Sequence, residues 1–304
     1  MSKTFQATQY HAYGGPEVLK LESLPLPEPG EGEVLIKVSF AGVNPIDWKL
    51  RSGAYHAFMP VTFPARPGID VSGVIEEVGP GVTTWKKGQA VLGTARGSYA
   101  EFALAKAADV IAKPEGLSFE NAASLPVGAL TAWQLVEEAG VSSGQRVLVQ
   151  GAAGGVGLFA LQFAKLRGAR MVGSASAANL AFVKALGAGE VLDYSKGPLA
   201  VKNLDVVIDT VGGAALDGAY SLLKKGGVLV TPAGQPSAEK AKAAGITAKG
   251  VNRGPITVLA VIADLVAAKK VVTEIQKVFP LDQASQAQAL SQGGHGRGRI
   301  LLKV

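Results

Sequence analysis

Polar side chains gather directly after an alternating apolar run in the segment FAGVNPIDWK, residues 40–49. Asn44 and Asp47 lie on either side of Pro45, and Lys49 and Tyr55 follow them. Amide, ammonium and phenol groups can donate hydrogen bonds to negative charge that develops on a reacting oxygen. We therefore take Asn44, Lys49 and Tyr55 as the candidate catalytic residues.

Each of these residues also has a structural interpretation, which the sequence leaves open. Asn44 before a proline can simply start a turn, because the Asn-Pro pair is frequent there. Asp47 can brace a loop, and we expect a structural role for Asp70 as well. Lys49 can be a solvated surface charge, and Tyr55 can be half-buried packing.

Cysteine is absent from the 304 residues, which excludes disulfides, thiolate nucleophiles, iron–sulfur clusters and cysteine-bound zinc. The composition, 48% hydrophobic and 18% charged, is that of a globular protein. Lys and Arg are scattered, so the net charge of +6 favours a small polyanionic cofactor over nucleic acid. The apolar window 256–263 is too short to span a bilayer, and no signal peptide is visible, so we expect a cytoplasmic protein.

A glycine-rich turn follows an apolar strand and precedes an amphipathic helix in the segment VLVQGAAGGVG, residues 147–157. A dinucleotide site requires this context, because backbone without side chains lets amides at a helix start face a pyrophosphate. The spacing departs from G-x-G-x-x-G, since Ala152 stands at the first glycine position. A glycine run alone can be merely a tight turn, but its place between strand and helix favours cofactor binding. The residues assigned to the cofactor are Gly151, Gly154, Gly155, Val156 and Gly157.

The second strand of this region predicts NADPH as the cofactor. An NAD site usually has an acidic residue about 20 positions after the glycine turn, bonded to the ribose 2′-hydroxyl. No acidic residue lies between Leu158 and Gly189, whereas Ser174, Ser176 and Asn179 are present there. Hydroxyl groups can hold the oxygens of a 2′-phosphate that a carboxylate would repel. The alternative is that the serines cap the next helix.

Two regions with different patterns of predicted secondary structure indicate two domains. Up to about residue 115, period-two strands such as 33–40 alternate with glycine and proline turns, which indicates a β barrel or sandwich. Thereafter the sequence predicts strands at 146–151, 170–175, 190–194, 205–211 and 227–234, and helices at 156–168, 179–186 and 214–225. This alternation predicts an α/β fold with a doubly wound parallel sheet. Because residues 299–304 resemble the first region, we expect domains of 1–122 with 269–304, and of 123–268.

Several motifs together resemble one known family. They are GVNPID, PGIDVSG, LPVGALTAW, GAAGGVG, IDTVGG and the terminal HGRGRILLKV. The chain is similar over its whole length to the zinc-independent branch of the medium-chain dehydrogenase/reductase superfamily. Within that branch it resembles the quinone oxidoreductases related to zeta-crystallin and the NADPH-dependent enone reductases. The resemblance implies a GroES-like catalytic domain and a Rossmann domain with the active site between them, and it suggests a homodimer.

The resemblance also implies what the polar segment does. Zinc-containing relatives have a Cys ligand at the position of Asn44 and a His ligand at that of Ile69, and isoleucine cannot bind a metal. The expected activity is hydride transfer from NADPH to quinones or to the C=C bond of α,β-unsaturated carbonyls. The alternatives are an enoyl-thioester reductase and an NADPH-binding protein without turnover. Some relatives have a tyrosine facing the substrate where this chain has Lys49, so a side chain or solvent can supply the proton.

Further cofactor contacts follow from the same resemblance, residue by residue. Asn44 is expected near the nicotinamide ribose, and Thr131 on the nicotinamide side. The residues expected around the nicotinamide ribose at strand ends are Thr210, Val211, Gly212 and Gly234. Tyr194 is expected beside the 2′-phosphate. The alternative for each of these residues is loop packing.

Overall fold

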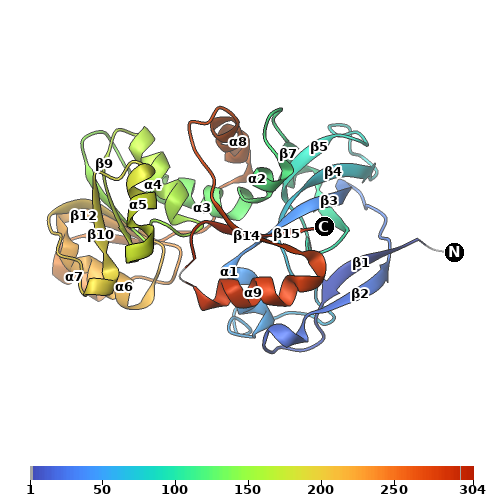
Figure 1. Cartoon of the computed structure of the whole chain (residues 1–304), viewed down its shortest axis with the longest axis horizontal. Coiled ribbons are helices and arrows are strands. Elements are labelled where there is room, and N and C mark those ends of the chain that lie inside the picture. Colours follow the sequence, from blue (N-terminus) through green and yellow to red (C-terminus); the bar gives the residue numbers. More distant parts are fainter. Residues whose placement is uncertain (1–2, 295) are drawn as a thin grey trace.

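A computed structural model of the protein describes residues 3–294 and 296–304, which fold around two large β-sheets (Figure 1). One sheet has seven strands and is mainly antiparallel; the other has six strands, all parallel. The parallel sheet lies at the left of Figure 1 and the antiparallel sheet at the right. This is the α/β architecture that the change of pattern along the sequence predicts, with the GroES-like domain and the Rossmann domain that the family resemblance implies.

The antiparallel sheet forms because apolar residues alternate along its strands and share one interior. Val34, Ile36 and Val38 of one strand face this interior. Its strands, in pairing order, are β14 (Ile275–Pro280), β15 (Arg299–Lys303), β3 (Glu33–Val43), β4 (Asp70–Val78), β5 (Ala90–Thr94) and β7 (Val110–Ala112), with β6 (Phe102–Lys106) on β3. Two strands, β1 (Thr4–Gln9) and β2 (Lys20–Pro25), form a separate antiparallel pair. The late strands β14 and β15 thus return to the sheet of the N-terminal region, whereas the exact domain boundaries stay a prediction.

The parallel sheet has the strand order of a dinucleotide-binding fold. Its strands, in pairing order, are β10 (Glu190–Asp193), β9 (Arg170–Ala175), β8 (Arg146–Gln150), β11 (Leu204–Asp209), β12 (Leu223–Thr231) and β13 (Thr247–Gly250). The direction in which successive strands are added to the sheet reverses between β8 and β11. Ligands of open parallel sheets bind at such a switch point, outside the carboxyl ends of the strands.

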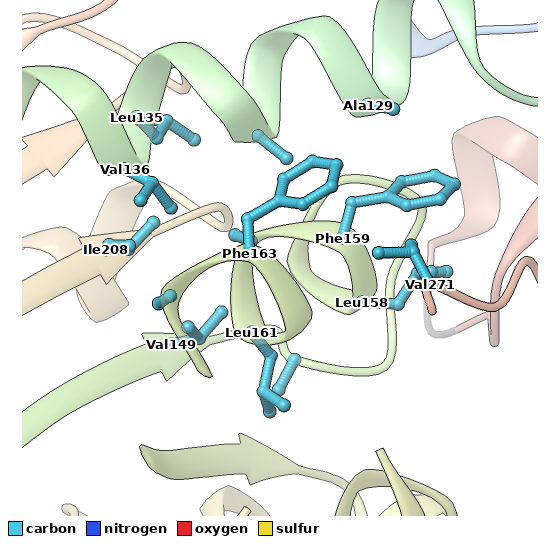
Figure 2. Close-up of a cluster of buried hydrophobic side chains, with 14 of the residues drawn as sticks. Ala129, Leu135, Val136, Val149, Leu158, Phe159, Leu161, Phe163, Ile208 and Val271 are labelled. Carbon is cyan, nitrogen blue, oxygen red and sulfur yellow. The ribbon is translucent and has the colours of Figure 1, made fainter. Parts of the chain in front are cut away.

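Helices cover both faces of the parallel sheet because its strands are apolar on both sides. Val147 and Val149 of β8 pack on one helix layer, and Leu148 packs on the other. The first layer contains α3 (Pro126–Glu138), α4 (Gly157–Leu166), α5 (Leu180–Ala185) and α8 (Leu259–Ala267); the second contains α6 (Gly213–Ala219) and α7 (Ala238–Ala244). Figure 2 shows the stacked rings of Phe159 and Phe163 of α4 below α3.

A late segment of the chain joins the two domains. Helix α9 (Ala284–Gly293) packs on β14 and β15, and α2 (Phe119–Ala123) lies against β3 and β4. Just before β15, the Gly298 N–H donates to the Ala153 carbonyl over 2.8 Å, and Gly298 pairs with Gly154 as an isolated parallel bridge. The glycine turn of the Rossmann domain is therefore bonded directly to the chain that enters the other sheet.

The predicted helix 214–225 is wrong in its second half. Helix α6 ends at Ala219, a 3₁₀ turn covers Tyr220–Leu222, and β12 begins at Leu223. Leu223 pairs with Leu204 of β11 ahead of a bulge, which draws the segment into the sheet. Pairing with a neighbouring strand has overridden the local helical pattern, as tertiary contacts commonly do.

Candidate functional site

Asn44 stands at the junction of β3 and helix α1 (Pro45–Arg51), where it is the N-cap residue. Pro45 takes the first helical position, which its fixed backbone geometry suits. The Asp47 carboxylate accepts a hydrogen bond of 2.8 Å from the Asn44 N–H. Asn44 therefore starts a helix instead of a simple turn, and Asp47 lies in the first turn of that helix instead of in a loop.

The strand registers bring two further side chains to Asn44. Gly42 pairs with Asp70 across β3 and β4, and Val43 pairs with Ile300 across β3 and β15. Because β3 and β15 are antiparallel, the next step in register brings Arg299 level with Asn44. The ends of three adjacent strands thus carry an amide, a carboxylate and a guanidinium in one place.

These three side chains form a buried hydrogen-bonded network. Arg299 Nη2 donates to Asn44 Oδ1 over 2.8 Å and to Asp70 Oδ2 over 2.7 Å, and Asn44 Nδ2 donates to Asp70 Oδ2 over 3.0 Å. Asn44 and Asp70 are fully buried, and Arg299 is 4% exposed. A buried charge of this kind is tolerated only when it is paired and hydrogen-bonded.

Asp70 also connects the network to the Rossmann domain. Its Oδ1 atom accepts a hydrogen bond of 3.0 Å from the Val127 N–H in the first turn of α3. The N-terminus of a helix favours a negative charge. Burial raises the pKa of the Asp70 carboxyl, while Arg299, Asn44 and the Val127 N–H each oppose the rise. Thr131, which was predicted on the nicotinamide side, lies on the same helix and is mostly buried.

Asp47 is a second buried carboxyl next to the first. It accepts a hydrogen bond of 2.8 Å from the Tyr99 hydroxyl, besides that from the Asn44 N–H. Burial raises the pKa of Asp47 to about 7, although these two hydrogen bonds lower it. The Asp47 carboxyl therefore titrates near neutral pH inside the protein.

The other two catalytic candidates contact each other. Lys49, in the second half of α1, donates from Nζ to the Tyr55 hydroxyl oxygen over 3.3 Å. The ammonium also lies 5.3 Å from the centre of the Tyr55 ring and 5.7 Å from that of Trp48. Both side chains are half-buried. Because lysine occupies an acceptor site of the phenol oxygen, the phenol hydrogen stays available for another acceptor.

The glycine turn lies at the switch point of the parallel sheet. Gly151 adopts φ +70°, where a side chain would be strained and would approach Thr210 and Val211 within 3 Å. A Cβ at Gly157 would collide with the Gly151 carbonyl oxygen, whereas a Cβ at Gly154 would meet only that oxygen at 3.3 Å. The turn is thus tightly folded on itself at Gly157 and less crowded at Gly154, which fits a pyrophosphate site.

The segment after β11 faces this turn. Asp209, fully buried, accepts hydrogen bonds from the Val211 and Gly212 N–H groups and from the Thr231 hydroxyl. These bonds fix residues 210–212, while the Val211 side chain stays 57% exposed. An exposed valine over the open end of a parallel sheet offers a flat apolar surface, which fits a nucleotide ring. Gly234, exposed after β12, lies at the same edge of the sheet.

The residues assigned to the 2′-phosphate lie at the carboxyl ends of β9 and β10, with Ser174 inside β9 and the others after the strands. The Asn179 amide donates to the Ser176 hydroxyl over 3.2 Å, and both side chains are partly exposed. Ser174 is only 2% exposed, so Ser176 and Asn179 are the members of the set that reach the surface. Tyr194 opens a 3₁₀ turn after β10 and is 41% exposed; Lys196 ends the same turn.

Sequence patterns did not identify Arg299, Asp209 and Lys196, although the first two lie inside motifs that carry the family resemblance. A charged residue within an otherwise apolar strand end, as in GRILL and VVIDT, is the signal that could have identified Arg299 and Asp209.

Metal-ligating residues do not gather at this site. Among residues 3–294 and 296–304, no three His, Asp or Glu side chains form a group that could hold a metal ion. Ile69, directly before β4, has no ligand atom to offer. The donor set therefore does not fit zinc. In the same described residues, no helix has the length and apolarity needed to cross a membrane.

Replacing Asp47 with Asn removes one titration while keeping an acceptor oxygen for Asn44 and Tyr99. Because burial raises the Asp47 pKa from 3.8 to about 7, the folded state binds this proton more tightly than the unfolded state. Between these two pH values, the Asp47 carboxyl therefore lowers the free energy of unfolding as the pH rises, by roughly 1 kcal/mol for each pH unit. Urea unfolding at pH 5 and pH 8 is expected to show a larger fall for the unmodified protein than for D47N. The exposed Asp264 on α8 provides the control D264N, and parallel profiles for all three proteins would contradict the assignment.

Comparison with known proteins agrees with this architecture. Residues 30–115 match the alcohol dehydrogenase GroES-like domain family, and residues 186–302 match the family described as zinc-binding dehydrogenase. A chloroplast envelope quinone oxidoreductase homolog of Arabidopsis thaliana is 35% identical over 326 residues, covering 99% of each chain.

Solved structures give the same result. The quinone oxidoreductase of Coxiella burnetii superposes with a TM-score of 0.91 at 36% identity, over 99% of this chain and 100% of that chain. The Escherichia coli quinone oxidoreductase complexed with NADPH superposes with a TM-score of 0.89 at 25% identity, over 98% and 100%. The chain belongs to the quinone oxidoreductases of the medium-chain dehydrogenase/reductase superfamily.

Proposed function

We propose that this oxidoreductase transfers hydride from NADPH to quinones or to the C=C bond of α,β-unsaturated carbonyls, without a bound metal. The observation that carries the proposal is the hydrogen bond between Lys49 and Tyr55, because it leaves a phenol hydrogen for a substrate oxygen. The donors lie on and just after the helix that Asn44 caps, and Asn44 is the residue expected at the nicotinamide ribose.

The residue types favour carbonyl reduction over alcohol oxidation. An alcohol becomes a good hydride donor when a Lewis acid stabilises its alkoxide, and Asn44 and Ile69 stand where relatives have zinc ligands. In conjugate reduction, negative charge instead develops on a carbonyl or quinone oxygen. Hydrogen-bond donors fixed near that oxygen are sufficient to stabilise it.

When bound, NADPH supplies the hydride. Tyr55 donates its phenol hydrogen to the substrate oxygen, and Lys49 orients that phenol and adds a positive charge nearby. Asn44, held by Asp70 and Arg299, would bind the cofactor. The proton that completes the reaction comes from Tyr55 or from water.

NADPH in preference to NADH is supported by the edge of the sheet at β9 and β10. Ser176 and Asn179 provide neutral donors there, and Lys196 provides an exposed cation. The carboxylate of Asp193, which adjoins this turn, accepts hydrogen bonds from the Ser195 N–H and hydroxyl. The Escherichia coli relative is described as complexed with NADPH.

We also propose that the protein works as a homodimer in the cytoplasm. The edge strand β13 supports a homodimer, because its outer side can pair with the sheet of a second copy. Light scattering measures the oligomeric state, and fractionation of cells measures the location.

The direct test is a screen of NADPH oxidation with quinones, free enones and enoyl thioesters. We expect turnover with a quinone or an enone, and little change after dialysis against a chelator. Preferred turnover of the thioester would instead identify an enoyl-thioester reductase. NADPH binding without oxidation of any substrate would favour a non-catalytic protein, and equal efficiency with NADH would contradict the cofactor preference.

Changing Tyr55 to Phe removes the phenol hydrogen and leaves the ring. We expect kcat to fall by about 100-fold, as for the loss of one oxyanion donor, with NADPH affinity unchanged. K49M is also expected to lower kcat. The control is Y220F, which loses the bond from the Ser237 N–H to the Tyr220 hydroxyl far from the site. Unchanged kcat in both Y55F and K49M would remove these residues from the mechanism.

Two alanine substitutions in the glycine turn separate binding from folding. G154A places a methyl group 3.3 Å from the Gly151 carbonyl oxygen, a tight contact that a small shift relieves, so we expect a small loss of thermal stability and loss of NADPH binding, measured by NADPH fluorescence. G157A places its methyl group against the Gly151 carbonyl, so we expect loss of stability. Tight NADPH binding by G154A would show that the pyrophosphate does not lie over this residue.

A further inference from the structure

Arg299 lies where the catalytic domain meets the glycine turn, and neighbouring glycines leave it just enough room. A Cβ at Gly155 would lie 2.9 Å from Arg299 Cδ, and a Cβ at Gly128 would lie 3.2 Å from Nη1. Gly155 belongs to the glycine turn and Gly128 to the first turn of α3. The Arg299 side chain is therefore enclosed by the glycine turn, which is expected at the pyrophosphate, and by α3, which carries Thr131 and is expected on the nicotinamide side.

The partners of Arg299 determine how the Asn44 amide is oriented. A guanidinium can only donate, and a carboxylate can only accept. Arg299 therefore requires the Asn44 oxygen on its side, and Asp70 requires the Asn44 nitrogen. The amide nitrogen has two hydrogens, of which Asp70 takes one. The second hydrogen has no hydrogen-bond acceptor among the described residues. The orientation of the amide is fixed, because a flipped amide would lose both bonds.

We propose that Arg299 is a positioning residue that acts on the cofactor through Asn44. It fixes the amide so that one N–H faces the cofactor, and it holds this amide in register with the glycine turn. The inference rests on the proposed function, since it concerns how the same site binds NADPH and transfers hydride.

Stability alone does not explain this arrangement. The Nε–H of Arg299 is buried and has no hydrogen-bond partner among the described residues, which is unfavourable for a buried donor. Arg299 donates both of its hydrogen bonds in the network from one nitrogen, Nη2. The side chain is thus placed to serve Asn44 and Asp70 at one atom, while its Nε donor is left unsatisfied.

A double-mutant cycle tests the proposal, using R299M and N44A singly and together. In the unmodified background we expect R299M to reduce kcat about 100-fold, the size typical of a misplaced catalytic contact. In the N44A background we expect R299M to change kcat by less than about threefold, because the group through which it acts is gone. Equal effects in the two backgrounds would overturn the proposal.

Further variants distinguish positioning from folding. R299K keeps a cationic nitrogen donor and is expected to recover at least about tenfold of the lost kcat, which also provides a measurement if R299M does not fold. The control is R51M, because Arg51 is another buried arginine, bonded to Gln288 and the Gly14 carbonyl instead of to Asn44. R51M is expected to lower the thermal midpoint while its effect on kcat stays the same with and without N44A. Loss of stability by R299M with unchanged kcat and NADPH affinity would show a structural role only.

Binding measurements keep this proposal separate from the proposed activity. The dissociation constant for NADPH is measured by fluorescence for the same four proteins without any substrate. If no quinone or enone is reduced, the proposed function fails, and the cycle is evaluated from these constants. Non-additive weakening then supports the role of Arg299, and additive weakening or an absence of NADPH binding overturns it.

Discussion

A carboxylate and a guanidinium that are both withdrawn from water, those of Asp70 and Arg299, meet 2.7 Å apart where the two domains join. Neither charge is stable there alone, because removing one partner from a buried pair costs about 3–5 kcal/mol. The pair is completed by the Asn44 amide and by the first turn of α3. Three strand ends, a helix start and the glycine turn are consequently held in one arrangement.

The two sides of the site differ in how firmly they are held. On the side proposed for the cofactor, Asn44, Asp70 and Asp209 are fully buried and bonded to backbone or charged groups. On the side proposed for the substrate, the Tyr55 side chain is held by one longer hydrogen bond, in a turn where Phe58 is 83% exposed. Exposed loops on a rigid scaffold are more mobile than the elements that they connect, so we expect the segment around Tyr55 to move more than the network around Asn44.

Local patterns in the sequence were enough for the main elements and for the glycine turn. Strand periodicity predicted β3, and the alternation of short apolar segments with helices predicted β8 and β9 closely. The strand–turn–helix context located Gly151 and its neighbours at the switch point. The polar residues after β3 were recognised because charge and amide groups directly after a buried strand are unusual. What the sequence could not provide is the register between distant strands. Arg299 and Asp70 are separated by 229 positions, and no local pattern says that they become neighbours.

The prediction of a helix over 214–225 was wrong at its end for a similar reason, because Leu223 pairs with Leu204 in the sheet. The roles assigned to Lys49, Tyr55 and the cofactor residues stay predictions, since proximity alone does not establish a role.

The position of β15 between β14 and β3 has a consequence for how the molecule is made. During synthesis, β3, β4 and the whole Rossmann sheet leave the ribosome before β15 does. The Asp70 carboxyl group therefore stays hydrated or protonated until Arg299, its counter-ion, has been synthesised. Nascent chains can thus form the nucleotide-binding half early as an independent unit. The catalytic half, by contrast, is completed by a strand that is inserted into its sheet at a late stage.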